Sequence, residues 1–284
     1  MTKLSCLAPA KLNLFLHVVG RRADGYHLLQ TLFRFIDLND TLHFNLRHDG
    51  EIHRLTQIAA VPEADDLCVR AAKLLQKATD CRFGVDIELE KIIPMGGGLG
   101  GGSSDAATTL LALNRLWQLN LSRERLMELG LTLGADVPVF IFGENAFAEG
   151  VGEKLQAYEL PDAWYLVLTP PAHVPTAQIF TDPELTRNTI SMTMRALPIG
   201  RQYKSGQFGN DLQPVACRLY PVIAQYLAWL NQYAPALMTG SGACVFAEFQ
   251  TEAAAVAVLK VLPEKMCGFI AHGLQQHPMR EFAA

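Results

Sequence analysis

Residues 94 to 104 read PMGGGLGGGSS, and six of these eleven residues are glycine. Glycine loses the most backbone freedom on folding, so this stretch is unfavourable inside a helix or a strand. Its neighbours have regular patterns: residues 85–90, VDIELE, alternate like a strand, and residues 103–119 favour a helix. The stretch is therefore predicted to be a loop between a strand and a helix, approached so closely that side chains are excluded.

Two known glycine loops resemble this stretch but fit it badly. The P-loop, GxxxxGK[ST], needs a lysine after its last glycine, where this chain has Ser103. Gly96, Gly98 and Gly101 spell the dinucleotide fingerprint GxGxxG, but such a match is almost automatic in a glycine-rich run. That fingerprint also requires a second strand ending in an acid, and here the position falls at the start of another helix. A nicotinamide-dependent oxidoreductase therefore stays a weak alternative.

A third interpretation keeps the physics of these loops without either motif. The N–H groups at the start of a helix lack partners and carry partial positive charge, so they attract anions. Glycines let an anion reach the main chain, and Ser103 and Ser104 add hydroxyl donors. The loop is predicted to bind an anion, most often a phosphate. A flexible surface turn capped by serine is the structural alternative.

Composition limits the architecture. The chain has 284 residues, of which 50% are hydrophobic, enough for a large core and two domains. Prolines cluster between residues 161 and 175, which places the domain boundary near residue 160. The predicted domains are residues 1–160 and 161–284.

Charge and cysteine usage limit the class of partner. The net charge is −4 without a basic block, so no nucleic-acid partner is expected. The apolar runs are shorter than a membrane span and the N-terminus lacks a signal-peptide pattern. No membrane partner is expected, and the protein is predicted to be cytoplasmic. Six dispersed cysteines and eight dispersed histidines indicate reduced thiols and no structural metal.

Helix and strand patterns alternate along the chain, which indicates a mixed α/β or α+β class. Asp66 and Ser122 are the predicted N-caps of helices in the segments 64–79 and 121–134. Further helices are expected at 221–233 and 251–262. The expected strands are at 11–20, 28–46, 85–94, 140–150, 164–170, 243–249 and 267–274.

Three motifs resemble, in order, those of the GHMP kinases, the family of galactokinase and of homoserine, mevalonate and phosphomevalonate kinases. They are PAKLNLFL at 9–16, PMGGGLGGGSSDAA at 94–107 and MTGSGACVFA at 238–247. The resemblance spans nearly the whole chain. It implies an α+β fold of two domains, the N-terminal one ribosomal-protein-S5-like and the C-terminal one ferredoxin-like. It also implies a left-handed βαβ crossover, against the general right-handed rule.

Within the family, the chain resembles the branch whose acceptor is a cytidine diphosphate-linked methylerythritol. Its loop, GLGGGSS, is longer than the common GLGSS, and RRADGYHLLQTLF follows the first motif. The resemblance implies transfer of the ATP γ-phosphoryl group to the 2-hydroxyl of that small-molecule substrate. Another small alcohol acceptor and a non-catalytic nucleotide-binding relative stay open as alternatives.

Asp136, in LGADVP, is the catalytic base that the resemblance implies, and Lys11 is its catalytic partner. Taken alone, Asp136 could equally cap a turn, and Lys11 could be a solvated strand residue. A lysine in the apolar strand PAKLNLFL is costly to bury without a counter-charge. The resemblance implies that Lys11 lies near the base, so the two side chains are expected to be in contact, with Lys11 favouring the developing alkoxide.

The resemblance also implies residues that contact the acceptor. Aromatic stacking and hydrogen bonds would hold the cytosine, and a second glycine turn would lie beside the diphosphate. Asn13 shares a strand face with Lys11. From the residues alone, Tyr26 and His27 could be surface residues and Phe180 a core residue. The implied substrate-binding residues are Asn13, Tyr26, His27, Thr176, Phe180, Gly240, Ser241 and Gly242.

The implied nucleotide site is the glycine loop. Residues 64–67, ADDL, resemble the family stretch beside the adenine pocket. Mg²⁺ is implied as the usual partner of ATP, with Ser104 as a candidate ligand and no acidic ligand assigned. A monomer or weak homodimer is expected. The implied cofactor-binding residues are Pro94, Met95, Gly96, Gly97, Gly98, Leu99, Gly100, Gly101, Gly102, Ser103 and Ser104.

Overall fold

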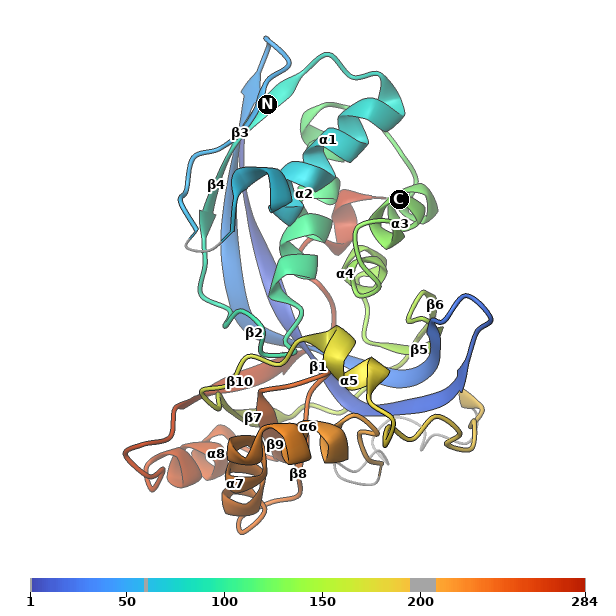
Figure 1. The fold of residues 1–284 in the computed structure, drawn as a ribbon. Helices are drawn as coiled ribbons and strands as arrows, with labels where there is room; N and C mark the ends of the chain where they lie inside the picture. Colours follow the sequence, from blue (N-terminus) through green and yellow to red (C-terminus); the bar gives the residue numbers. More distant parts are fainter. Residues whose placement is uncertain (1, 59–60, 195–207, 284) are drawn as a thin grey trace.

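The computed structural model describes residues 2–58, 61–194 and 208–283. Its two longest strands, β1 (Lys3–Arg21) and β2 (His27–Arg47), form an antiparallel hairpin that crosses most of the molecule (Figure 1). The turn between them holds the predicted Asp-Gly pair, with Gly25 at a φ of +92°. The strands expected at 11–20 and 28–46 are confirmed, and the first begins earlier, at Lys3.

Strand β2 organises the sheet. One of its edges pairs with β1, and the other is shared end to end by β5 (Ala146–Gly150), β10 (Gly268–Leu274) and β4 (Gly84–Glu90). Strand β10 also pairs with β7 (Trp164–Leu168), so it joins the two parts of the sheet. The remaining strands are β3 (Ile52–Arg54), β6 (Lys154–Ala157), β8 (Ala236–Met238) and β9 (Val245–Phe249).

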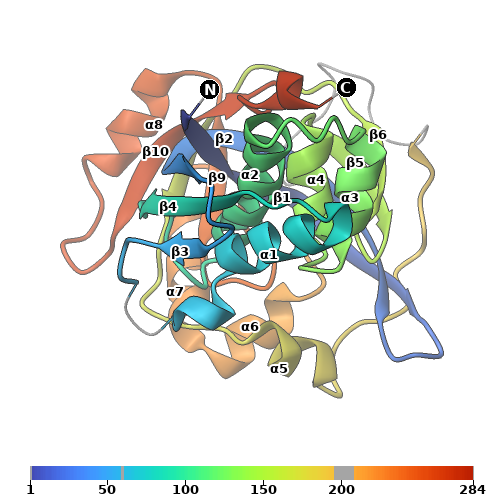
Figure 2. The same ribbon diagram turned by 90° about the horizontal axis from the view of Figure 1, so that it is seen from above.

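Helices cover the sheet (Figures 1 and 2). The β1–β2 part carries α1 (Leu67–Thr79), α2 (Gly101–Leu116), α3 (Arg123–Leu131) and α4 (Val137–Phe142). The other part carries α5 (Thr176–Thr181), α6 (Gln213–Leu219), α7 (Pro221–Leu230) and α8 (Glu252–Leu259). Helix α2 is buried all round because small or apolar residues occupy every side of it. Single 3₁₀ turns lie at Glu63–Asp65 and Arg280–Phe282.

The predicted helix starts are confirmed. The Asp66 carboxylate accepts hydrogen bonds from the N–H groups of Cys68 and Val69, at 2.8 and 3.2 Å. The Ser122 hydroxyl accepts one from the N–H of Arg125 at 3.3 Å. Both side chains thereby satisfy donors that a helix start leaves unpaired.

Two predicted strands are partly wrong. Residues 140–142, the start of the run expected as a strand over 140–150, belong to α4, and Gly143, at a φ of +81°, ends that helix before β5. A short, fully buried apolar run has no periodicity that separates strand from helix. The strand expected over 85–94 ends at Glu90 because the Asp40 carboxylate takes the N–H groups of Ile92 and Ile93.

One of the hydrophobic clusters lies at the seam between the two parts. It contains Leu12 of β1, Tyr165 of β7 and Phe246 of β9, together with Ile93 and Leu99 from the glycine loop and its approach. The loop is thereby anchored where the parts meet. The mixed α+β class is confirmed, whereas the domain division at residue 160 and the left-handed crossover stay predictions. No helix in the described part of the chain is long and apolar enough to cross a membrane.

Candidate active site

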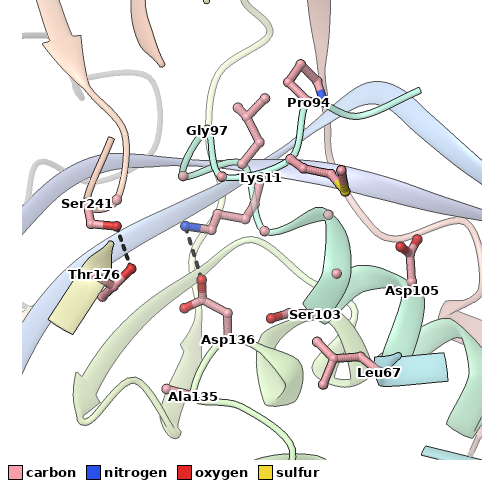
Figure 3. Close-up of a pocket in the computed structure, with 18 of the residues that line it drawn as sticks. Lys11, Leu67, Pro94, Gly97, Ser103, Asp105, Ala135, Asp136, Thr176 and Ser241 are labelled. Carbon is pink, nitrogen blue, oxygen red and sulfur yellow. Dashed lines mark hydrogen bonds and ion pairs between the residues drawn. The ribbon is translucent and has the colours of Figure 1, made fainter. Parts of the chain in front are cut away.

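A cavity of about 600 Å³ opens at this seam. Its walls are the glycine loop, the middle of β1, the start of α4, helix α5 and the turn that follows β8 (Figure 3). Residues far apart in the sequence therefore line one space. From the predicted sites it collects Lys11, Asn13, Asp136, Thr176, Phe180, residues 94–103 and residues 240–242.

Backbone conformation and contacts within the protein both require glycine in this loop. Gly96, Gly98 and Gly100 have φ of +69°, +77° and +74°, which favour glycine. A Cβ atom on Gly98 would lie 2.2 Å from the Thr239 carbonyl oxygen, and one on Gly97 would lie 2.6 Å from the Cys244 Sγ. The close approach predicted from the sequence is thus made, in part, by the second glycine turn.

The loop's carbonyl groups are held by neighbours. The Leu99 carbonyl accepts from the N–H of Lys11 at 2.9 Å, and the Gly97 carbonyl accepts from the N–H of Cys244 at 3.1 Å. Among the hydrogen bonds of the described residues outside helices and strands, no N–H of residues 95–100 donates. These free donors, beside the start of α2, form a site that suits an anion.

The expected contact between Lys11 and Asp136 is confirmed: Nζ lies 3.2 Å from Oδ2 (Figure 3). The Lys11 side chain is 3% exposed and that of Asp136 36% exposed, so the carboxylate is the partner open to a ligand. Asp136 precedes α4, but its side chain makes no capping hydrogen bond. The alternative role of Asp136 as a helix or turn cap is therefore not supported.

Asn13 is held by hydrogen bonds to three neighbouring residues. Its Oδ1 accepts from Lys11 Nζ at 2.5 Å, and its Nδ2 donates to Thr31 Oγ1 at 2.9 Å. Its backbone N–H donates to Thr239 Oγ1 at 2.9 Å. Asn13 therefore orients the Lys11 ammonium group. The second hydrogen on its Nδ2 stays available for a ligand.

The second glycine turn lies against the glycine loop and lines the same cavity. Ser241 Oγ lies 2.8 Å from Thr176 Oγ1, which joins this turn to the start of α5 (Figure 3). Asn210 Nδ2 donates to the Met238 and Gly240 carbonyls at 2.7 and 2.8 Å and fixes the turn from behind. Sequence reasoning missed Asn210, because only the folded chain brings it to this turn.

Of the three predicted base-binding residues, Phe180 lines the cavity, whereas Tyr26 and His27 lie outside it. Tyr26 is 65% exposed, and neither Tyr26 nor His27 lines the cavity. The His27 ring stacks on Phe180, with centroids 5.0 Å apart and an interplanar angle of 29°. Arg187, which sequence reasoning missed, donates to His27 Nε2 at 3.1 Å.

The two serines of the loop differ in position. Ser103 lines the cavity, whereas Ser104 is fully buried within α2 and does not. Ser103 is therefore the better placed of the two to offer a hydroxyl to a ligand. In the described part of the chain no group of three or more His, Cys, Asp and Glu side chains could hold a metal ion.

A buried charge cluster, also missed from the sequence, supports the loop. Lys91 Nζ donates to Asp40 and, at 2.8 Å, to Asp105 Oδ2 at the start of α2. Burial raises the pKa of Asp105 to about 7, with the charge of Lys91 opposing this shift and that of Asp40 adding to it. Burial lowers the pKa of Lys91, but the two carboxylates outweigh it and the net shift is upward.

Comparison with known proteins gives this arrangement a family. The model of the GHMP kinases N terminal domain matches residues 66–144, and that of the GHMP kinases C terminal matches residues 193–266. The chain belongs to the GHMP kinase family. The fold and the ATP use expected from the three motifs are thereby confirmed for this GHMP kinase, as is the expectation of a small-molecule substrate.

Eight relatives that are 57–61% identical to this GHMP kinase share one name. The 4-diphosphocytidyl-2-C-methyl-D-erythritol kinase of Nitrosospira multiformis is 60% identical over 99% of this chain and 95% of its own length. That of Nitrosomonas europaea is 61% identical over 97% of this chain and 98% of its own. A crystal structure of 4-(cytidine 5'-diphospho)-2C-methyl-D-erythritol kinase matches with a TM-score of 0.80 and 34% identity, over 95% of this chain and 99% of that one.

A more distant structure shows how far the fold extends. A crystal structure of mevalonate kinase matches with a TM-score of 0.68 at 16% identity, over 96% of this chain and 99% of that one. At that identity the match concerns the fold alone.

Proposed function

We propose that this GHMP kinase transfers the γ-phosphoryl group of ATP to the 2-hydroxyl of 4-diphosphocytidyl-2-C-methyl-D-erythritol. The observation that carries the proposal is the Lys11–Asp136 pair, 3.2 Å apart, in the same cavity as the glycine loop. The relatives at about 60% identity, all named for this acceptor, support the choice of substrate.

The glycine loop would bind the ATP phosphates through its free N–H groups and the start of α2. When bound, magnesium supplies positive charge to the phosphate oxygens. The residues present fit an ion held chiefly by the nucleotide, because the described residues offer no cluster of three acidic or histidine ligands. Ser103 would contribute a hydroxyl oxygen, and ordered waters the remaining positions.

Asp136 would accept the proton of the acceptor hydroxyl as the oxygen attacks phosphorus. Its carboxylate is the exposed member of the pair, and Lys11 holds it in place from the buried side. The Lys11 ammonium would also stabilise charge on the alkoxide as it forms. Asn13 in turn fixes Lys11.

The second glycine turn and α5 would hold the acceptor. Gly240, Ser241 and Gly242 line the cavity beside the phosphate loop, and the diphosphate of the acceptor would lie next to them. Phe180, with Tyr26 and His27 beside it, would hold the cytosine, and Thr176 would contribute a hydroxyl. The two substrates would then share one cavity.

The first prediction tests the base. Asp136→Asn keeps the shape but removes the proton acceptor, so kcat is expected to fall by about 10²- to 10⁴-fold. Nucleotide binding should persist. ADP release from purified protein, ATP, Mg²⁺ and the cytidyl acceptor measures the rate, and Asp162→Asn, at an exposed site, is the matched control.

Two outcomes would overturn the proposal. One is ATP binding without acceptor-dependent ADP release in the unaltered protein. The other is release of ADP with homoserine or mevalonate in place of the cytidyl acceptor.

We further propose that the kinase acts in the cytoplasm as a monomer or weak homodimer, without a nucleic-acid or membrane partner. The net charge of −4 and the absence of a basic block support this. Sedimentation of the purified protein over a concentration range measures the oligomeric state.

A further inference from the structure

Arg187 lies in the segment that follows α5, partly buried, and all of its guanidinium nitrogens are engaged. Nη2 donates to the carbonyls of Phe180 and Asp182, at 3.1 and 2.6 Å. Nη1 donates to the Leu185 carbonyl at 3.1 Å. The remaining nitrogen, Nε, donates to His27 Nε2 at 3.1 Å. The three hydrogen bonds to backbone carbonyls therefore fix the guanidinium group, and with it the direction of the Nε–H group that donates to His27.

This contact determines the tautomer of His27. Arginine is a donor only, so His27 Nε2 must present its lone pair, and the ring proton of the neutral imidazole then sits on Nδ1. Protonation of the ring would set two N–H groups against each other. Burial and the positive charges of Arg187 and Arg21 all lower the pKa of His27, which favours the neutral ring.

The surroundings leave the Nδ1–H group as the polar atom that His27 can offer. One face of the ring is covered by Phe180, with centroids 5.0 Å apart, so no base fits between these two rings. None of the described residues hydrogen-bonds Nδ1. His27 is thus built to read a base by a hydrogen bond at its edge rather than by stacking.

We propose that Arg187 sets the base specificity of the acceptor site by fixing His27 as an Nδ1–H donor. Cytosine presents an unprotonated N3, which accepts a hydrogen bond, whereas uracil presents an N3–H group at the same position. A fixed donor therefore pairs with cytosine and is left unpaired, facing another donor, with uracil. This inference rests on the proposed function, because it assigns the discrimination to the cytidyl acceptor.

The tautomer is measured directly by ¹⁵N NMR of the histidine side chains near pH 7.5, with the His27 signals assigned by their loss in His27→Asn. The expected result is an Nδ1–H tautomer in the unaltered protein and a shift toward the Nε2–H tautomer in Arg187→Gln. An Nε2–H tautomer in the unaltered protein, or no change in Arg187→Gln, overturns the proposal. This readout needs no substrate, so it stands apart from any failure of the proposed function.

The specificity is measured as the ratio of kcat/KM for the cytosine acceptor to that for the same molecule carrying uracil. Arg187→Gln is expected to lower this ratio at least tenfold, through the KM of the cytosine acceptor. The kcat and the KM for ATP should change by less than twofold. In a His27→Asn background, Arg187→Gln should lower the ratio no further, because Arg187 acts through His27.

Controls separate this role from simple support of the loop. Arg218 also holds the segment after α5, through Asp182 at 2.6 Å and Glu184 at 2.9 Å, but it does not contact His27, so Arg218→Gln should keep the ratio. Arg187→Lys keeps the charge without the planar fork and serves if Arg187→Gln fails to fold. It should also lower the ratio. An unchanged ratio in both Arg187 variants, or equal losses in Arg218→Gln, overturns the proposal.

Discussion

The ammonium group of Lys11 makes three contacts inside the site. It donates to Asn13 Oδ1 at 2.5 Å, pairs with Asp136 at 3.2 Å and lies 5.5 Å from the centre of the Phe33 ring. A charged lysine side chain that is only 3% exposed is costly to bury unless its ammonium group is paired. The apolar strand indicated that a buried lysine would need a counter-charge, and the resemblance to the family pointed to Asp136 as that partner.

Lys11→Met should therefore act on the chemistry more than on nucleotide binding. The variant keeps most of the side-chain volume but removes the charge, so kcat is expected to fall by about 10²- to 10³-fold. The KM for ATP should change little. Steady-state kinetics check this, with Lys73→Met, at an exposed position of α1, as control. A loss of ATP affinity equal to the loss of kcat would contradict it.

Asp105 is a carboxyl group whose ionisation the fold opposes. It is 3% exposed, and its pKa is raised to about 7 from an ordinary value of 3.8. Between these two values the folded chain binds a proton that the unfolded chain has released. The free energy of unfolding attributable to this carboxyl therefore falls as pH rises through that window, and is fully present below it.

Asp105→Asn removes this dependence. Relative to the variant, the unaltered protein should lose about 1 kcal/mol of unfolding free energy per pH unit between roughly pH 4 and pH 7. Urea denaturation at a series of pH values measures the difference. Parallel stability curves for the two proteins would mean that Asp105 is already ionised in the fold.

At the scale of elements, the glycine loop and the turn after β8 form an interlocked pair. The Gly98 α-carbon faces the Thr239 carbonyl so closely that a Cβ atom would lie 2.2 Å from it, and Cys244 donates its N–H to Gly97. Neither element can move far without the other. The walls for the two substrates are thus set relative to each other by backbone contact.

Gly98→Ala should disturb both walls. The alanine would need a φ near +77° as well as a displaced turn, so the KM for ATP and for the acceptor should both rise, by about tenfold or more. Kinetics with each substrate varied check this. Gly209→Ala, where no atom lies within 4 Å of the added Cβ, is the matched control. A rise confined to the KM for ATP would show that the elements are not coupled.

Elements also show where sequence reasoning ends. The N-caps Asp66 and Ser122 were predictable because a cap acts on residues within one helical turn of it. Helix α4 was not, since residues 137–142 are buried on every side and carry no period. Its start sets the backbone of Asp136, so the base was predicted by resemblance while the element that presents it was missed.

At the scale of the whole molecule, the site is assembled from both parts of the chain. Asn13 hydrogen-bonds Thr239 across the seam where Leu12, Tyr165 and their neighbours pack. On one side of that seam, Thr176 hydrogen-bonds Ser241. Motifs could place Lys11, Asp136 and both glycine turns. They could not place Lys91, Asn210 or Arg187, because these act through partners distant in the sequence and carry no local pattern of their own.

Because both parts of the chain meet at this seam, nucleotide binding should reduce amide hydrogen exchange on both sides of it. A non-hydrolysable ATP analogue is expected to slow amide hydrogen exchange in residues 238–244 as well as in 94–104. Exchange in α7, which does not line the cavity, should be unchanged. Protection limited to residues 94–104 would contradict a shared seam.

The position of strand β10 late in the sequence affects when the sheet can be completed during synthesis. It fills the gap on the edge of β2 between β5 and β4, and it joins that edge to β7. A ribosome makes residues 268–274 long after it has made β2, so the growing chain carries an open strand edge during most of its synthesis. Both walls of the cavity can be translated before the strand that ties their sheets together exists. The kinase is therefore expected to become competent only late in translation, and its nascent chain is the form most exposed to mispairing.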